Sequence, residues 1–319
     1  VVGARSAAFV PIHELGLIVV DEEHEPSYKA DDRPRYHARD VVLMRGRQAG
    51  IPVVMGSATP SLESHHNAIE GKHHRLVLPR RMGAEELPEV IIEDLRGSGI
   101  GAGESLGPGL DRALDETLAR GEQAIIFHNR RGFARFLQCH ACGRVEECPH
   151  CEISLTWHLQ DDRLHCHYCG HRAPRPDRCG DCEEKVMRPR GAGTQRVELA
   201  LTTRFPEARV LRLDHDTTTR KSAHREILER FAAGDAEILL GTQMVAKGLH
   251  FPRVTLVGVI SADAGLHFPD LRAHERAFQL LTQVAGRSGR TGPGRVILQS
   301  YDPEHRVLQR VRELDVEGF

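Results

Sequence analysis

Short apolar runs recur along the chain, and most of them end in polar or glycine-rich turns. Between them lie longer segments in which apolar residues recur at helical spacing. The apolar runs predict strands at 17–20, 52–55, 124–127, 210–213, 238–240, 254–259 and 295–299. The helical spacing predicts helices at 38–49, 61–70, 110–120, 194–205, 221–233 and 273–285. Strands that alternate with helices favour parallel α/β sheets, which bind ligands at the carboxyl ends of their strands.

Two stretches interrupt this alternation. Residues 79–109 are rich in Pro, Gly and charge and are typical of a linker. Residues 139–190 hold the cysteines and show little helical periodicity, so they are typical of an inserted module. The expected organisation is the C-terminal part of a first lobe, a linker, and a second lobe with an insertion, at 1–80, 81–108, 109–319 and 139–190 respectively.

Length and charge narrow the class of protein. The chain has 319 residues, enough for about two domains. Its net charge of −2 gives no overall basic field, so a nucleic-acid site would have to be local. It has no apolar run of about eighteen residues and no visible signal peptide, so we expect no membrane span and a cytoplasmic location. Because it starts with Val1 in mid-pattern, we expect the natural N-terminus to lie upstream.

All eight cysteines lie between Cys139 and Cys182, as four C-x-x-C pairs. A disulfide framework is typical of small secreted domains, not of one patch in a long chain without a signal peptide. Clustered thiolate pairs suit tetrahedral zinc, and eight thiolates suffice for two closed structural sites. We therefore expect two zinc ions per chain and a reducing compartment.

The residues between Cys151 and Cys166 bear on which pairs share a metal. Apolar and polar residues alternate on both sides of Asp161-Asp162, which predicts a β-hairpin. A hairpin would bring the two inner pairs together and leave the two outer pairs to meet each other; sequential pairing is the alternative. The nested sets are Cys148, Cys151, Cys166 and Cys169 for one zinc, and Cys139, Cys142, Cys179 and Cys182 for the other.

The sequence Asp21-Glu22-Glu23-His24 directly follows the first predicted strand. An Asp at the carboxyl end of a buried strand can hold Mg²⁺ beside a nucleotide, and a neighbouring Glu can deprotonate the attacking water. The alternative is an acidic strand end that only faces solvent. One strand–helix unit later comes Gly56-Ser57-Ala58-Thr59-Pro60, a separation typical of a helicase core. By itself this second motif could be a turn in which Ser61 or Thr59 caps the next helix.

Two further motifs lie in the second half of the chain. The segment from Gly241 to Gly248 follows a predicted strand and could hold a phosphate through backbone N–H groups and hydroxyls. The string Gln283-x-x-Gly286-Arg287-x-Gly289-Arg290 follows a predicted helix, and its arginines could reach developing phosphate charge. The alternatives are a tight turn with an exposed Lys and a glycine-rich helix end with solvated arginines.

These four motifs, in this order, resemble motifs II, III, V and VI of superfamily 2 helicases. The segments 2–7, 36–40 and 127–132, with the eight-cysteine block, resemble the replication-restart DNA helicases of the primosomal protein N′ (PriA) family. The resemblance covers nearly the whole chain. It implies an α/β fold of two RecA-like parallel-sheet lobes, the first incomplete, with an inserted two-zinc, cysteine-rich module in the second. It also implies the nested pairing of the cysteines.

The resemblance carries roles over to the matching positions. Asp21 would contact Mg²⁺, Glu22 would be the general base, and Ser57 and Thr59 would couple hydrolysis to DNA binding. Expected nucleotide contacts and catalytic groups are Asp21, Glu22, His24, Gln283, Arg287 and Arg290. Expected DNA contacts are Arg5, Tyr28, Lys29, Asn129, Arg130, Arg131, Thr242, Gln243 and Lys247. For the segment from Tyr28 to Arg39, the alternative is that Tyr36 simply packs at the start of the following helix.

The implied function is an ATP-dependent 3′→5′ DNA helicase of replication restart and primosome assembly at stalled forks, with zinc, ATP and Mg²⁺ as cofactors. Its expected partners are branched and single-stranded DNA, other primosome proteins and single-strand-binding protein. A DNA-binding primosome scaffold without ATP hydrolysis is the alternative, and an RNA helicase is a third reading. Since no G-x-x-x-x-G-K-[ST] phosphate loop occurs in the sequence, we expect residues 1–319 alone to be inactive as an ATPase.

Overall fold

The structure is a computed structural model that divides into two compact units, Val1–Pro79 and Arg80–Phe319. No helix in the part of the chain that it describes has both the length and the apolar character needed to cross a membrane. The described residues are 1–78, 87–98, 100, 106–128, 136–184, 187–189, 194–214, 217, 223–243, 245, 251–289 and 293–319.

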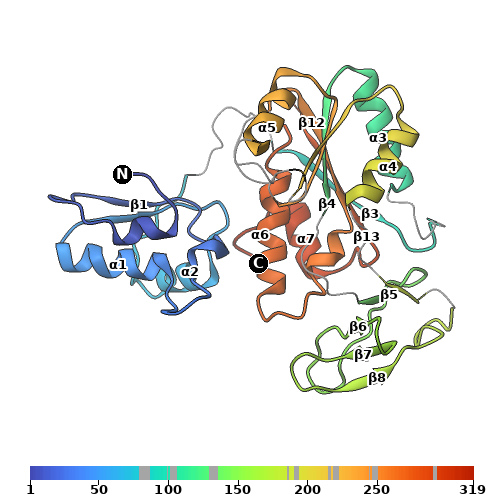
Figure 1. Ribbon diagram of the computed structural model, residues 1–319, viewed down its shortest axis with the longest axis horizontal. Coiled ribbons are helices and arrows are strands. Elements are labelled where there is room, and N and C mark those ends of the chain that lie inside the picture. The colour runs from blue at the N-terminus through green and yellow to red at the C-terminus, as the bar shows by residue number, and fades with distance from the viewer. Residues whose placement is uncertain are drawn as a thin grey trace. The chain divides into compact units, whose positions relative to one another are not determined.

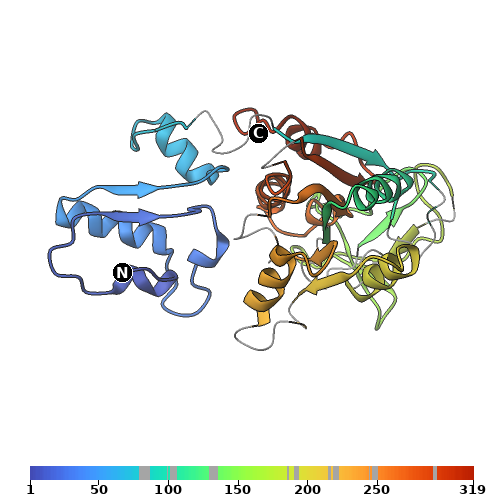
Figure 2. The same ribbon diagram turned by 90° about the horizontal axis from the view of Figure 1, so that it is seen from above.

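The first unit is built on two parallel strands, β1 (Ile18–Val20) and β2 (Val53–Met55), which run side by side (Figure 2). Helix α1 (Ala38–Ala49) connects them and α2 (Leu62–Ile69) follows, with short 3-10 turns η1 (Arg5–Phe9) and η2 (Pro26–Tyr28). Gly46 lets α1 lie close to β2, because a Cβ there would stand 2.3 Å from Val53 Cγ2. The buried core of this unit consists of Ala8, Val20, Ala38 and Val42.

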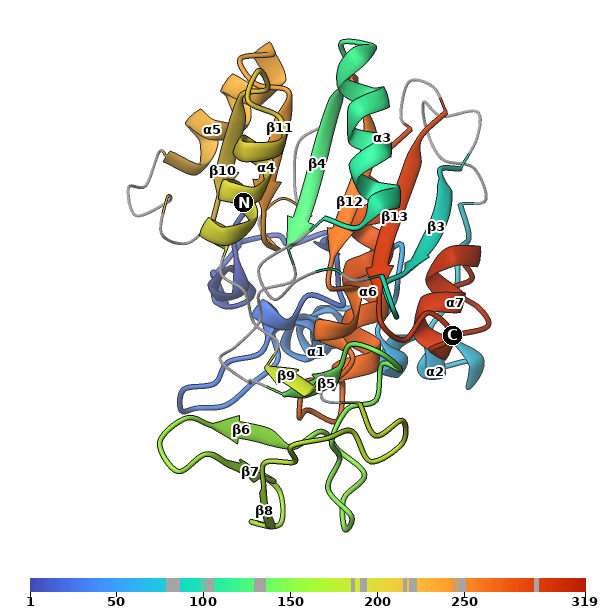
Figure 3. The same cartoon turned by 90° about the vertical axis from the view of Figure 1, so that its right-hand side faces the viewer.

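The second unit contains a sheet of six parallel strands among the described residues (Figures 1 and 3). The strands are β3 (Glu89–Asp94), β4 (Gln123–His128), β10 (Val210–Leu213), β11 (Ile238–Gly241), β12 (Val254–Ile260) and β13 (Arg295–Ser300). Their spatial order is β10-β11-β4-β12-β13-β3. Because all six run in the same direction, their carboxyl ends meet at one edge of the sheet.

Helices cover both faces of this sheet. α3 (Pro108–Ala119) and α4 (Thr194–Arg204) pack on one face, while α5 (Ala223–Ala233), α6 (Ala273–Ala285) and α7 (Arg306–Glu313) pack on the other. The alternation along β4 divides its side chains between the two layers: Ile126 packs with α3, and Phe127 packs with α5 and α6. Both faces are apolar because both are buried, as is typical of parallel sheets.

The cysteine-rich module is inserted between β4 and α4 and lies beyond the carboxyl ends of the strands (Figure 3). It contains an antiparallel pair, β5 (Leu137–Cys139) with β9 (Met187–Pro189). It also contains a three-stranded antiparallel sheet of β6 (Thr156–His158), β7 (Arg163–His165) and β8 (Arg172–Pro174). A 3-10 turn, η3 (Ala262–Gly265), follows β12 near the same edge of the main sheet.

The predicted α/β fold with a cysteine-rich insertion is confirmed, and every predicted helix and strand is present within about two residues at each end. The interpretation of 81–108 as linker is wrong for residues 89–94. These residues form β3, which pairs along its whole length with β13. The apolar run Val90-Ile91-Ile92 is short and is flanked by Pro88 and acidic residues. Because this composition resembles that of a linker, the edge strand was not predicted.

Candidate zinc centres and nucleotide-site residues

The four C-x-x-C pairs fold into the same turn. In each, the residue after the second cysteine donates its backbone N–H to the carbonyl of the first cysteine, at 2.9–3.0 Å. That residue has a positive φ in every case: Gly143, Glu152, Gly170 and Glu183. The first cysteine donates its own N–H to the carbonyl five residues on, which closes the turn. Each turn therefore presents two sulfur atoms on one side.

Backbone amides also point at the sulfur atoms. Burial raises the pKa of the Cys166 thiol, but N–H groups of Cys169 and Tyr168 outweigh burial and lower this pKa to about 7. The pKa of Cys179 falls to about 7 in the same way, through the N–H groups of Cys182 and Asp181. At Cys142, by contrast, burial and the neighbouring thiols raise the pKa to about 12, so the backbone donors favour the metal-binding thiolate at Cys166 and Cys179 but not at Cys142.

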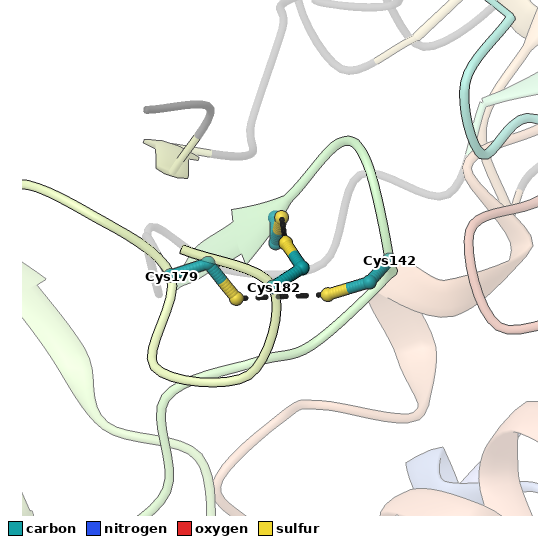
Figure 4. Close-up of side chains that lie close together, drawn as sticks. Cys142, Cys179 and Cys182 are labelled. Carbon is teal, nitrogen blue, oxygen red and sulfur yellow. Dashed lines mark hydrogen bonds between the residues drawn. The ribbon is translucent and has the colours of Figure 1, made fainter. Parts of the chain in front are cut away.

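The turns bring the sulfurs together in two groups of four, within each of which all Sγ atoms lie within 4.8 Å of one another. The nested prediction is confirmed: one group is Cys139, Cys142, Cys179 and Cys182, and the other is Cys148, Cys151, Cys166 and Cys169. In the first group, the Sγ atoms of Cys142 and Cys179 are 3.6 Å apart (Figure 4).

The sulfur spacing fits zinc. Four thiolates bound at 2.3 Å to a tetrahedral Zn²⁺ stand about 3.8 Å from one another. Cys139 with Cys182 and Cys148 with Cys169 are also 3.6 Å apart, much longer than a disulfide bond. All eight cysteines are free thiols. Both groups consist of cysteines only, which matches closed structural sites.

The predicted hairpin explains the nesting. β6 pairs with β7 in the register Thr156 to His165 and His158 to Arg163, with Asp161 and Asp162 in the turn between them. This pairing brings the two ends of the hairpin together, so the inner pairs of cysteines, which flank it, face each other. The outer pairs then meet because β5 and β9 pair on either side of the inner group.

The outer zinc site is also the part of the module that touches the main sheet. Gly97, which follows β3, donates its N–H to the carbonyl of His140 at 3.3 Å. The rings of His140 and Tyr301 lie 4.9 Å apart, and Tyr301 directly follows β13. A Cβ on Gly143 would stand only 1.9 Å from the carbonyl oxygen of Tyr301. The turn around Cys139 and Cys142 is therefore packed tightly on the carboxyl edge of the sheet.

In the first unit, the acidic quartet and the Ser57 motif lie together. Nδ1 of His24 is 2.7 Å from Ser57 Oγ and 3.6 Å from Glu22 Oε2. The hydroxyl of Ser57 also accepts the N–H of Thr59 at 3.1 Å. Asp21 is exposed at the end of β1, and the N–H of Glu22 donates to its Oδ1 at 3.0 Å. The two motifs are thus connected by His24 and by the N–H of Glu23, which donates to the carbonyl of Gly56 at 3.0 Å.

Glu23 is a structural residue of this site that the sequence did not single out. It is only 2% exposed, and its carboxylate accepts the Ser61 N–H at 2.6 Å, the Ser64 hydroxyl at 2.8 Å and Arg39 Nη1 at 2.9 Å. Burial raises the pKa of the Glu23 carboxyl, but these hydrogen bonds outweigh burial and hold the pKa below its ordinary value. Ser61 is also the N-cap of α2, as one of the two sequence alternatives had it. Glu23 therefore fixes the end of β1 against α1 and α2.

The predicted residues of the second unit lie at two places. Gln283 is in the last turn of α6, and Arg287 follows that helix. The neighbouring Ser288 donates its hydroxyl to the carbonyl of Thr255, near the start of β12. By contrast, Thr242 and Gln243 follow the carboxyl end of β11. Asn129, Arg130, Arg131, Lys247 and Arg290 lie outside the described residues.

The three predicted DNA contacts of the first unit are partly engaged within it. Arg5 donates to the carbonyl of Lys29 at 2.6 Å and lies over the ring of Tyr36, 5.9 Å from its centroid. The hydroxyl of Tyr28 donates to the carbonyl of Asp21 at 2.9 Å. Both tyrosines pack against the core of the unit. The backbone carbonyl of Asp21 is thereby held by a residue predicted to sense DNA.

Comparisons with known proteins agree with these sites. Residues 148–174 match the family described as the PriA DNA helicase Cys-rich region domain, and residues 192–292 match the helicase conserved C-terminal domain. Over 321 residues the chain is 51% identical to the replication restart protein PriA of Bacillus subtilis, with 100% of this chain and 40% of that protein covered. Identity to the PriA of a Synechocystis species is 45% over 330 residues, with the same coverage.

The chain is similar to PriA proteins along its whole length. It spans about 40% of the length of these PriA relatives, and the aligned region takes in both zinc centres. Among solved structures, the helicase Lhr of Mycobacterium smegmatis bound to ssDNA and AMP-PNP has a TM-score of 0.49 and 14% identity. That alignment covers 94% of this chain and 31% of the other.

We predict two zinc ions per chain and a loss of zinc on cysteine substitution that depends on which cysteines share an ion. In nested sites, Cys148→Ser and Cys166→Ser affect the same ion, so the double variant keeps one zinc. In sequential sites, the two substitutions affect different ions, so the double variant keeps none. Elemental analysis after gel filtration distinguishes the results, and a zinc-free double variant would contradict the nested sites. Cys139→Ser combined with Cys179→Ser is the matching control for the outer ion.

We predict that Gly143→Ala is more damaging than Gly170→Ala. Both glycines follow the second cysteine of a turn with a positive φ, so both substitutions cost similar backbone strain. A Cβ at Gly170 meets nothing within 4 Å, whereas one at Gly143 strikes the Tyr301 carbonyl. Steric overlap of this kind costs about 1–3 kcal/mol, so the free energy of unfolding should differ by about that amount. Equal losses in urea titrations of the two zinc-loaded variants would refute the tight contact.

Proposed function

We propose that this chain is the motor region of an ATP-dependent 3′→5′ DNA helicase that acts in replication restart and primosome assembly at stalled forks. The observation that carries the proposal is the pairing of His24 with Ser57 beside an exposed Asp21, at the carboxyl end of a strand. An ATPase site needs a metal-binding carboxylate and a base there. The resemblance to PriA proteins over the whole chain supports the same activity.

The residues of the first unit suit distinct parts of hydrolysis. Mg²⁺, when bound with ATP, would supply charge neutralisation of the phosphates. Asp21 would hold it, because its side chain is exposed while its backbone carbonyl is held by Tyr28. Glu22 would accept the proton of the attacking water. Its side chain is 43% exposed, so a water molecule can reach it.

His24 would transmit the state of the nucleotide site to the DNA-binding residues. Its Nδ1 stands between Glu22 and the hydroxyl of Ser57, and Ser57 in turn holds the N–H of Thr59. A change of position at Glu22 during hydrolysis would therefore reach the Ser57–Thr59 turn. Ser57 and Thr59 would couple hydrolysis to DNA grip by this route.

The remaining predicted residues complete the proposal. Gln283 would contact the nucleotide or its water, and Arg287 and Arg290 would stabilise developing phosphate charge, an effect worth about 10³–10⁵ in rate for an arginine finger. The DNA contacts would be to the phosphate backbone, which makes binding depend on salt. The DNA-contacting residues would be Arg5, Tyr28, Lys29, Asn129, Arg130, Arg131, Thr242, Gln243 and Lys247.

Branched and single-stranded DNA would be the substrates, and primosome proteins and single-strand-binding protein the partners. We place this activity in the cytoplasm, where thiols stay reduced. The competing function is a DNA-binding scaffold without hydrolysis. A scaffold would have no need of an exposed carboxylate pair coupled through His24 to a second motif, so we favour the motor.

We predict that Glu22→Gln, in a full-length protein that contains this chain, lowers DNA-stimulated ATP hydrolysis about 10²- to 10⁴-fold, the usual contribution of a general base. Binding of ATP and DNA should persist, because the amide keeps the size of the side chain. Glu25→Gln is the control and should retain full turnover. Glu23→Gln should instead destabilise the first unit, because it breaks a buried charge pair with Arg39. Unchanged turnover in Glu22→Gln would show that Glu22 is not the general base and that another carboxylate has this role.

A further inference from the structure

Three histidines whose rings contact one another lie beside the inner group of cysteines. His158 ends β6, His165 ends β7, and His167 lies in the turn between Cys166 and Cys169. Thr156 pairs with His165, so His158, two residues from Thr156, lies on the same face of the hairpin as His165. Their rings stack with centroids 4.2 Å apart.

The Nε2 atoms of His158 and His167 lie close together. Their Nε2 atoms are 3.3 Å apart, within reach of a hydrogen bond between the two rings. Two imidazole nitrogens bound at 2.0–2.1 Å to one tetrahedral metal ion stand about 3.3–3.4 Å apart. The observed separation therefore also fits two ligands on a common metal. His167 is exposed and His158 half-buried, so an ion could reach both.

His165 supports this arrangement without being a ligand itself. Its Nε2 lies 2.7 Å from Asp161 Oδ2, which occupies that nitrogen and fixes the plane of the ring. The stacked His165 ring then restricts the rotation of His158.

We propose that His158 and His167 bind a third divalent transition metal ion, distinct from the two cysteine-bound zincs. Imidazole nitrogen suits zinc, copper and nickel. With two protein ligands the remaining positions belong to water, so this ion exchanges with solvent, unlike those in the closed Cys₄ sites. It ties the end of the β6–β7 hairpin to the inner zinc turn and braces the hairpin when it is bound. If instead the two imidazoles merely share a proton, no third ion binds.

The test uses the untagged, zinc-loaded protein. Calorimetric titration with Ni²⁺ should reveal a binding event that His158→Gln and His167→Gln each weaken by about 10- to 100-fold, the loss that even an outer-shell change causes. His150→Gln is the matched control, because His150 lies in the facing turn between Cys148 and Cys151, and it should bind as the unsubstituted protein does. Zinc content must stay at two ions per chain throughout.

A spectroscopic measurement distinguishes metal binding at His158 and His167 from binding at other histidines of the chain. Electron paramagnetic resonance of one equivalent of Cu²⁺ should show coupling to two imidazole nitrogens, and the double variant His158→Gln/His167→Gln should lose that pattern. The proposal is overturned if Ni²⁺ does not bind, if it binds by releasing zinc, or if the copper spectrum is the same in the double variant.

Discussion

The tetrahedral requirement of zinc–thiolate bonding is the constraint on which the arrangement of the second unit depends. The buried apolar residues of the module other than cysteine are few in the part that the structure describes: Phe136, Leu137, Val145, Leu155 and Leu164. The three leucines form a cluster with four of the cysteines. A module of fewer than about 70 residues rarely folds on so small a core without a metal or a disulfide. The metal sites therefore take the place of a core, and a hairpin between the inner pairs sets how they nest.

The outer site joins two kinds of structure. On one side, the turn around Cys139 and Cys142 closes a zinc centre; on the other, its Gly143 and His140 press on Tyr301 at the carboxyl edge of the main sheet. Tyr301 is in turn held by Asp263, which accepts its N–H at 2.7 Å. The module is thereby anchored beside the residues that follow β12 and β13.

Periodicity and spacing predicted most of this fold, because buried strands and amphipathic helices leave repeated patterns. The nested zinc sites followed from one hairpin. Strand β3 and helix α7 were not predicted. β3 is a short apolar run among prolines and charged residues, and in α7 only Val307, Leu308 and Val311 are buried. Consecutive carboxylates cannot be ranked by sequence, so nothing separated the exposed Asp21 from the buried Glu23. Gly143 and Gly170 occupy equivalent positions, and only the approach of Tyr301 tells them apart.

The amide of Gly97 reports most directly on whether the outer zinc site anchors the module, because it donates to the carbonyl of His140. Hydrogen exchange at this amide can be compared in Cys139→Ser, which disrupts the outer site, and in Cys148→Ser, which disrupts the inner one. The anchoring account predicts faster exchange at Gly97 in Cys139→Ser and an unchanged rate in Cys148→Ser. Equal rates in the two variants, or faster exchange only in Cys148→Ser, would contradict it.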